Sequence, residues 1–326
     1  MSTSAIDHKE AAAIQAAKEG VVVCDRSFWG RIRVSGDDRL RFLHNQSTND
    51  FQSLKPGQGC DTVLVTSTAR TIDLVSSYIL DDAVLLLVSP HRRELIMQWL
   101  DRYIFFADQV ELTDITDETA TLSLIGPESD GIIEKLGAGS VIGERHGNHT
   151  LVDGAIVAVG SGLASPGYTI IPPAGDKEKW WSQLLELGVV ELSDRSWEML
   201  RILQGRPAAD LELTDDYNPL EVGLWQTVSF NKGCYIGQET IARLNTYKGV
   251  KQYLWGIRLN APAEIGNMIT LAEEKIGKLT SYTETPDGYF GLGYIRSKAG
   301  GIGLKVQVGT TEGEIVAIPF VSHEYP

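Results

Sequence analysis

The hydrophobic and polar positions of the chain follow one pattern up to about residue 250. Residues 29–36, "WGRIRVSG", alternate apolar and polar side chains, which is the period of a half-buried strand. Residues 58–80 and 82–89 indicate further strands, and residues 90–105 carry apolar side chains at helical spacing. Strands followed by a helix recur at 119–137 and 154–188. This order predicts α+β units with antiparallel sheets that helices cover on one face.

Local signals predict where several elements begin and end. Asp37 is placed to cap a helix that follows it, and Ser193 is placed to cap a helix over residues 193–205. Residues 206–224 are expected to form a loop, because prolines such as Pro219 oppose regular structure. An alanine-rich amphipathic helix is expected within residues 1–20.

Beyond Lys251 the pattern changes to short strands at hairpin spacing. Glycines and the turns at 286–288 and 299–301 separate these strands, and no helical pattern interrupts them. Residues 251–326 are therefore expected to form a small antiparallel barrel or sandwich.

Length and charge narrow the class of protein. A chain of 326 residues exceeds one hydrophobic core and predicts two or three domains. The net charge of −14 argues against direct binding of nucleic acid and favours a soluble monomer. The sequence holds no run of about 20 apolar residues, so no membrane span is expected. Acidic residues near the N-terminus argue against a presequence. A cytoplasmic protein is therefore expected, and the alternative is a protein of the plastid stroma from which the presequence has been removed.

The cysteines and histidines do not have metal-site spacing. The three cysteines, Cys24, Cys60 and Cys234, form no C-x-x-C pair, and the six histidines form no H-x-x-x-H. Neither a disulfide framework nor a metal site is expected.

The segment 231–246, "NKGCYIGQETIARLNT", is the strongest candidate for a site. Glycines flank Cys234, and a helix is predicted to begin after Gly237. The first N–H groups of such a helix can bind an anion, and four basic residues face a single acid between 231 and 251. Cys234 can be a core filler, half of a disulfide, a metal ligand or part of a binding or reactive loop. The surroundings favour a loop that meets an anionic, partly aromatic ligand.

Three stretches resemble one known family. "KGCYIGQE" at 232–239 resembles the motif of the YgfZ-type folate-binding proteins, which are relatives of the glycine-cleavage T-protein, an aminomethyltransferase. "LRILQGRPAADLELTDDYNPLEVGL" at 200–224 and "VSGDDRLRFLHNQSTND" at 34–50 are similar to two further segments of that superfamily. The resemblance runs from about residue 21 to the C-terminus.

The resemblance implies a three-domain T-protein-like ring. A folate-binding α+β domain would comprise residues 21–110 and 190–250, and a ferredoxin-like α+β domain residues 111–189. A β-barrel would comprise residues 251–326. It also implies tetrahydrofolate as ligand, in the 5-formyl or another one-carbon form. The implied role is accessory to making or repairing iron–sulfur proteins, including tRNA-modifying radical enzymes, with client iron–sulfur proteins as partners.

The resemblance places Cys234 near the folate and predicts the residues that bind it: Lys232, Gly233, Tyr235, Gln238, Glu239, Arg243, Asn45, Gln46 and Glu221. Two departures from the T-proteins matter. A single acid, Asp73, stands where they have a catalytic pair, and Thr169 stands where they grip the pterin with a glutamate. The pterin would then be oriented by Asn45, Gln46 or Glu221.

Three functions are compatible with these residues. The first is a folate-binding accessory protein. The second is a folate-dependent aminomethyltransferase or demethylase with Asp73 as general base. The third is a protein-interaction scaffold with a vestigial pocket.

Overall fold

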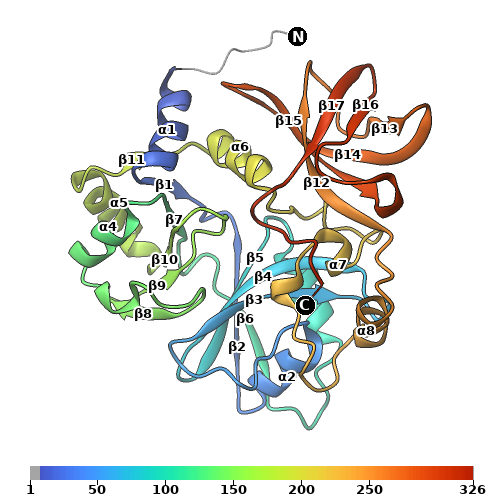
Figure 1. The fold of residues 1–326 in the computed structure, drawn as a ribbon. Coiled ribbons are helices and arrows are strands. Elements are labelled where there is room, and N and C mark those ends of the chain that lie inside the picture. The colour runs from blue at the N-terminus through green and yellow to red at the C-terminus, as the bar shows by residue number, and fades with distance from the viewer. Residues whose placement is uncertain (1–7, 326) are drawn as a thin grey trace.

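The computed structural model describes residues 8–325 and consists of two α+β domains and a barrel (Figure 1). The first domain is a fully antiparallel five-stranded sheet. Helices α2 (Arg39–Gln46) and α3 (Arg93–Asp101) bury apolar side chains against one face of it. Its strands, in spatial order, are β3 (Gly59–Val65), β4 (Thr71–Ile79), β5 (Ala83–Val88), β2 (Gly30–Ser35) and β6 (Glu111–Asp114).

The second domain is a six-stranded sheet in which only β1 and β11 run parallel. Helices α4 (Ser129–Lys135) and α5 (Lys177–Glu186) cover one face. Helices α1 (His8–Glu19) and α6 (Asp194–Gln204) cover the other face, in a core shared with the first sheet. Its strands, in spatial order, are β11 (Val190–Glu191), β1 (Val22–Asp25), β7 (Leu122–Ile125), β10 (Gly167–Ile171), β9 (Ala155–Val159) and β8 (His149–Val152).

The C-terminal strands close into an antiparallel six-stranded barrel, which confirms the barrel over the sandwich. A closed barrel leaves no sheet edge unpaired. Its strands are β12 (Gln252–Leu259), β15 (Gly288–Arg296), β14 (Glu274–Thr285), β13 (Met268–Leu271), β16 (Lys305–Val308) and β17 (Thr311–Val316). The expected α+β class, with two sheet-based domains and a C-terminal β-barrel, is therefore confirmed.

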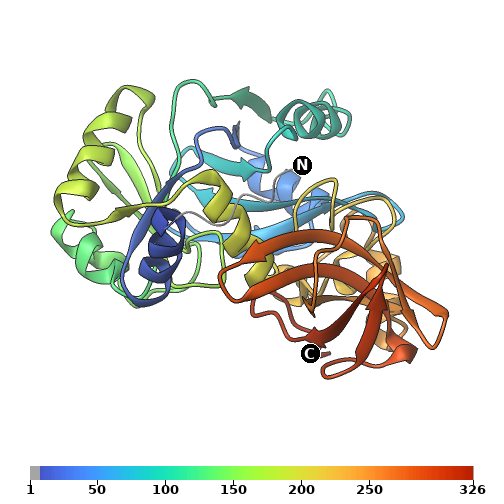
Figure 2. The same cartoon turned by 90° about the horizontal axis from the view of Figure 1, so that it is seen from above.

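Helix α6 lies between the second domain and the barrel (Figure 2). A buried ion pair between α6 and the loop that follows it is hydrogen-bonded to the barrel. Arg201 on α6 lies 3.1 Å from Glu212, and Ser281 on β14 bonds to both. Tyr294 on β15 donates to the Glu212 carbonyl at 2.7 Å. A buried pair tolerates removal from water only when its remaining donors and acceptors are bonded, as they are here.

Three local expectations differ from the structure. Strand β1 pairs with β7 and β11, so residues 22–25 join the second sheet instead of the first. Pro219 begins helix α7 (Pro219–Val222), since the first helical position needs no N–H donor. Helix α2 begins after Asp38, not Asp37, and the Asp38 carboxylate bonds to Gln109 instead of capping the helix. The Ser193 cap is confirmed, because its hydroxyl accepts from the Ser196 N–H at 3.1 Å.

Candidate functional site

Lys232 lies on the loop before α8 (Gln238–Thr246), and its ammonium group reaches back to the end of α2. It donates to the backbone carbonyls of His44, Ser47 and Asn49, the last two at 2.8 Å and 2.6 Å. Carbonyls at a helix C-terminus lack partners within the helix, and a cation there also interacts favourably with the helix dipole. The side chain is buried against Tyr235, and burial lowers the Lys232 pKa to about 8. All three N–H donors of the ammonium group are therefore bonded to carbonyls of the protein itself.

Cys234 is exposed and unpaired, which makes the core-filler interpretation wrong for this residue. Gly237 closes the loop at φ 81°, where an added Cβ would lie 2.9 Å from the Thr66 carbonyl oxygen. Glycine is thus required for the loop to pack against the β3–β4 hairpin. Tyr235 is buried beneath the loop, and this burial raises its pKa to about 12.

The end of α2 holds two more of the expected ligand residues. The Asn45 carbonyl accepts a hydrogen bond from the Ile236 N–H at 3.0 Å, which fixes the loop on the helix. Gln46 is buried, and its Oε1 has no hydrogen-bond partner among residues 8–325. The structure therefore brings Asn45, Gln46 and Lys232 together.

The remaining expected residues lie on α7 and α8. Gln238 begins α8, Glu239 and Arg243 are exposed on its first and last turns, and Gly233 is exposed in the preceding loop. Glu221 is buried in α7 and completes a capping box by accepting from the Asn218 N–H at 3.2 Å. The side-chain hydrogen bonds of Glu221 go to Asn218 and Gln252, not to the loop that holds Cys234.

A different group of polar side chains is buried where the two α+β domains meet α6. We call Arg26, Trp29, Trp197 and Arg206 the arginine–tryptophan cluster. The guanidinium carbons of Arg26 and Arg206 lie 4.6 Å and 4.8 Å from the centre of the Trp29 ring. Trp197 meets Trp29 edge-on at 5.7 Å. The two arginines are only 1% and 3% exposed, and neither forms an ion pair within the described chain.

Segments far apart in sequence build this cluster. Arg26 follows β1, Trp29 precedes β2, and Arg206 follows α6 directly after the left-handed Gly205. Gly162 leaves room for Arg26, since an added Cβ at this position would lie 2.8 Å from its Nη1. The backbone at Gly162 therefore leaves space for the Arg26 side chain.

The cluster contains buried N–H groups without acceptors. Within residues 8–325, the Nε atoms of Arg26 and Arg206 and the Nε1 atoms of Trp29 and Trp197 have no hydrogen-bond partner. Burial lowers the pKa of both arginines, and the nearby charge of Arg26 contributes to lowering that of Arg206 to about 10. Most buried donors in proteins have a partner, so these four N–H groups are free to bond to water or to a ligand.

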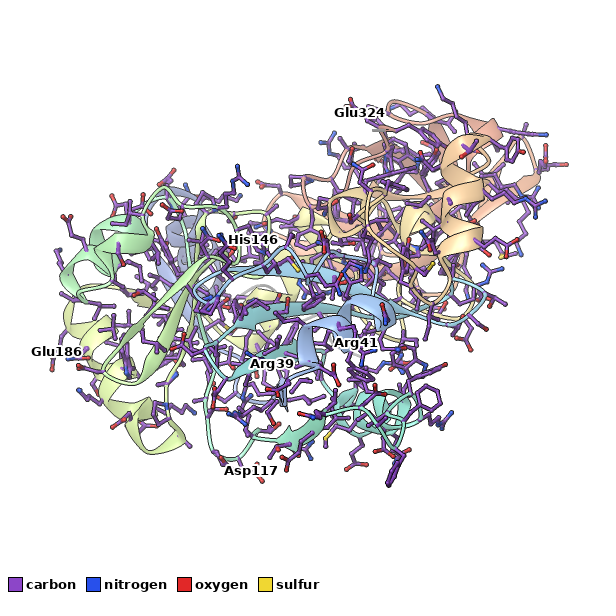
Figure 3. All side chains as sticks on the ribbon, turned by 90° about the horizontal axis from the view of Figure 1, so that it is seen from below. Arg39, Arg41, Asp117, His146, Glu186 and Glu324 are labelled. Atoms are coloured by element: carbon purple, nitrogen blue, oxygen red, sulfur yellow. The ribbon has the colours of Figure 1, made fainter. Side chains whose placement is uncertain are left out.

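Asp61 and His146 form an ion pair beside the cluster. His146 Nε2 lies 3.0 Å from Asp61 Oδ2, and Ser76 donates to Asp61 at 2.6 Å. Burial works to raise the Asp61 pKa, but His146, Ser76 and Arg206 outweigh it and hold the pKa at about 2. Asp61 in turn raises the pKa of His146, which lies where the second domain meets the strands of the first (Figure 3). The pair thus places a carboxylate that is ionised at neutral pH near Arg206.

Asp73 on β4 is fully buried. Its carboxylate accepts hydrogen bonds from the N–H groups of Leu74 and Ser89 at 3.0 Å and 2.8 Å. Burial raises its pKa to about 6, while Ser89, Arg206 and Arg92 act in the opposite direction. An aspartate with this pKa can exchange a proton near neutral pH.

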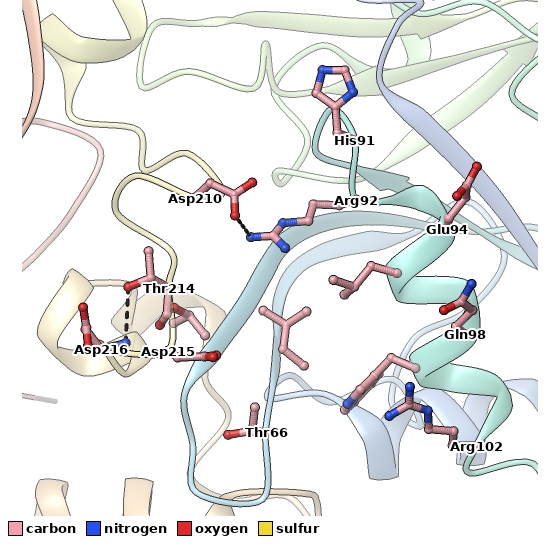
Figure 4. A pocket seen from close by; sticks show the side chains of 14 residues that line it. Thr66, His91, Arg92, Glu94, Gln98, Arg102, Asp210, Thr214, Asp215 and Asp216 are labelled. Carbon is pink, nitrogen blue, oxygen red and sulfur yellow. Dashed lines mark hydrogen bonds and ion pairs between the residues drawn. The ribbon is translucent and has the colours of Figure 1, made fainter.

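A cavity of about 830 Å³ opens between α3 and the loop 210–216 (Figure 4). An ion pair between Arg92 and Asp210 at 2.6 Å crosses it, and Asp215 and Asp216 add negative charge. Its basic side chains are matched by acids, and neither Lys232 nor Cys234 lines it. We therefore base the candidate site on the arginine–tryptophan cluster.

Sequence reasoning missed the arginine–tryptophan cluster and the ion pair beside it. Arg26, Asp61 and His146 belong to no motif, and only the three-dimensional structure brings them together. Arg206 had one signal, a charged residue directly after a well-formed helix at a point where the chain re-enters the interior.

The fold is that of the aminomethyltransferases. The solved structure of glycine cleavage system aminomethyltransferase T from Bartonella henselae superposes with a TM-score of 0.85, at 20% identity, over 97% of this chain and 90% of that one. A family model described as the GCVT N-terminal domain matches residues 3–232. The chain belongs to this family.

Sequence relatives include a plant protein and bacterial enzymes. A protein of Arabidopsis thaliana named "Putative transferase At1g60990, chloroplastic" is 49% identical, over 96% of this chain and 74% of its own length. The aminomethyltransferase of Bacillus mycoides is 28% identical, over 93% of this chain and 86% of its own length. Within residues 8–325, no helix combines the length and hydropathy needed to cross a membrane.

Proposed function

We propose that this protein binds a reduced folate at the arginine–tryptophan cluster and serves as an accessory protein in making or repairing iron–sulfur enzymes, including those that modify tRNA. The observation that carries the binding proposal is the set of buried, unpartnered N–H donors on Arg26, Arg206 and Trp29. A pterin ring is flat and rich in oxygen and nitrogen acceptors. Arg26 and Arg206 would donate to these acceptors, and Asp61 would accept from the ring's amino group.

Family membership supports the same ligand, since the related bacterial proteins are aminomethyltransferases. The chloroplastic name of the Arabidopsis relative supports the plastid stroma over the cytoplasm. Bound tetrahydrofolate would supply a one-carbon carrier. The contribution of this chain is to bind the ring, keep water from it and hold the charge of Asp61 beside it.

Calorimetry with 5-formyl-tetrahydrofolate tests the binding proposal. The unmodified protein should bind it saturably, and Arg26→Leu should weaken binding by about tenfold or more, the scale of one lost charge-assisted hydrogen bond. Arg258→Leu, an exposed arginine on β12, is the matched control and should bind normally. Saturable binding that is equal in both variants would place the folate elsewhere.

The accessory role needs its own assay. In a strain lacking this protein, activity of tRNA-methylthiolating iron–sulfur enzymes should fall and be restored by the unmodified chain but not by Arg26→Leu. Restoration by Arg26→Leu as well would favour a scaffold whose pocket is not used. Cys234→Ala in the same strain tests whether the exposed thiol takes part.

The second candidate is a folate-dependent aminomethyltransferase or demethylase. The observation favouring it is the buried carboxyl of Asp73, whose pKa of about 6 suits a general base. Folate-dependent release of ammonia or of a methyl group that Asp73→Asn abolishes and Cys234→Ala preserves would establish this activity.

A further inference from the structure

A second site is built from basic side chains beside α7 and α8. A hollow of about 670 Å³ is lined by five basic and two acidic side chains: Arg70, Lys248, Lys251, Arg296 and Lys298, with Asp216 and Glu221. The chain as a whole carries a net charge of −14, so this concentration of positive charge runs against its composition. A hollow lined mainly by one sign of charge focuses the field and attracts counter-ions.

Three parts of the fold hold these cations in place. Arg70 sits at the β3–β4 hairpin, where its Nη1 donates to the Asp216 carbonyl at 2.9 Å. Lys248 follows α8 and has the left-handed conformation at φ 49°. At the barrel, Gln252 pairs with Arg296, and the Ser297 N–H bonds to the Lys251 carbonyl at 2.8 Å. The backbone positions are therefore fixed without any bound ligand.

Acids of the chain neutralise the hollow only weakly. Glu221 lies 3.9 Å from Arg70, but it is already engaged in the α7 capping box, and burial raises its pKa. Arg296 pairs with Glu274 at 3.5 Å on the open surface, where such a pair contributes little. Lys251 and Lys298 have no ion pair within residues 8–325. Like charges kept close together disfavour the folded state unless an anion joins them.

We propose that this hollow binds a small oligoanion with two or more phosphate or carboxylate groups. Its volume falls in the range of small-molecule sites, about 300–1,000 Å³. The arginine forks at positions 70 and 296 match the paired oxygens of either group, and the lysines supply point charges. The site shares no residue with the arginine–tryptophan cluster and does not depend on the proposed function.

Calorimetry with two probes, inorganic tripolyphosphate and γ-linked triglutamate, tests the proposal at about 50 mM salt. At least one probe should bind saturably, and binding should weaken at about 300 mM salt. The double variant Lys251→Gln/Lys298→Gln should lose affinity by about tenfold or more, as expected when two of five cations are removed. Lys18→Gln/Lys135→Gln removes two exposed lysines from other helices and should bind as the unmodified protein does.

The choice of probe separates the two sources of negative charge. Binding of tripolyphosphate alone would assign phosphate, and binding of triglutamate alone would assign carboxylate. Equal binding of both would support the shared chemistry. The proposal is overturned if neither probe binds saturably, or if the two double variants bind alike. All four substituted positions are exposed, so both double variants should keep the fold. Thermal unfolding of each variant checks this.

Discussion

The sequence and the structure predict different roles for Lys232. If Lys232 bound the ligand, its loss would reduce affinity and leave the fold intact. In the structure, Lys232→Ala instead leaves the carbonyls of His44, Ser47 and Asn49 without their shared donor. Each buried acceptor left unpaired costs about 1–3 kcal/mol. The substitution should therefore destabilise the first domain.

The loss of stability in Lys232→Ala is partly offset, because the substitution also removes a buried charge. Burial lowers the Lys232 pKa from 10.5 to about 8, so the folded state already bears a desolvation cost of about 3 kcal/mol. Removing the charge relieves that cost while three acceptors lose their partner. With about 2 kcal/mol for each of the three acceptors, the free energy of unfolding should fall by about 3 kcal/mol after this offset.

Urea unfolding followed by tryptophan fluorescence measures this change. Lys232→Met keeps much of the aliphatic contact with Tyr235 and should lose nearly as much stability as Lys232→Ala. Lys135→Ala, at an exposed position on α4, should change stability by less than about 0.5 kcal/mol. A Lys232→Met variant as stable as the unmodified protein, with weakened folate binding, would refute the structural role and restore the ligand role.

Two further predictions concern pH. The Asp73 pKa rises from 3.8 to about 6 in the folded protein, so the folded state binds the extra proton and stability falls as pH rises through this window, by about 3 kcal/mol in total. Asp73→Asn should remove this component of the pH dependence in urea titrations, and an unchanged slope would contradict the buried placement. Asp61 raises the His146 pKa, so the pair stabilises the domain contact below the ordinary histidine pKa and is lost as pH rises through the raised one. An NMR titration should find the His146 pKa above its usual value and returning toward it in Asp61→Asn; the same pKa in both proteins would exclude the ion pair in solution.

Local signals in the sequence predicted the fold well. The cap at Ser193, the helical spacing around it and the strand spacing beyond residue 251 each depend on neighbours in the chain, and each led to the observed element. Pro219 was misinterpreted because proline stops a helix interior but starts a first turn. The membership of β1 depends on partners about 100 and 165 residues away, which no local pattern encodes.

The candidate site was less predictable for the same reason. The motif around Cys234 drew attention to Lys232. In the structure its ammonium group donates to the carbonyls at the C-terminal end of α2. Arg26 and Arg206 are 180 positions apart and meet over Trp29 only in the folded chain. Their burial without a carboxylate partner is visible only in three dimensions.

Arg206→Leu tests the central claim most directly, because one substitution should move two quantities in opposite directions. Burial and Arg26 hold the Arg206 pKa at about 10, so the charged side chain costs the ligand-free protein about 3 kcal/mol. Replacing it with leucine should raise the free energy of unfolding by about 1–3 kcal/mol. The same variant should bind 5-formyl-tetrahydrofolate about tenfold more weakly or worse. Unchanged affinity, or a loss of stability in the ligand-free protein, would contradict the account.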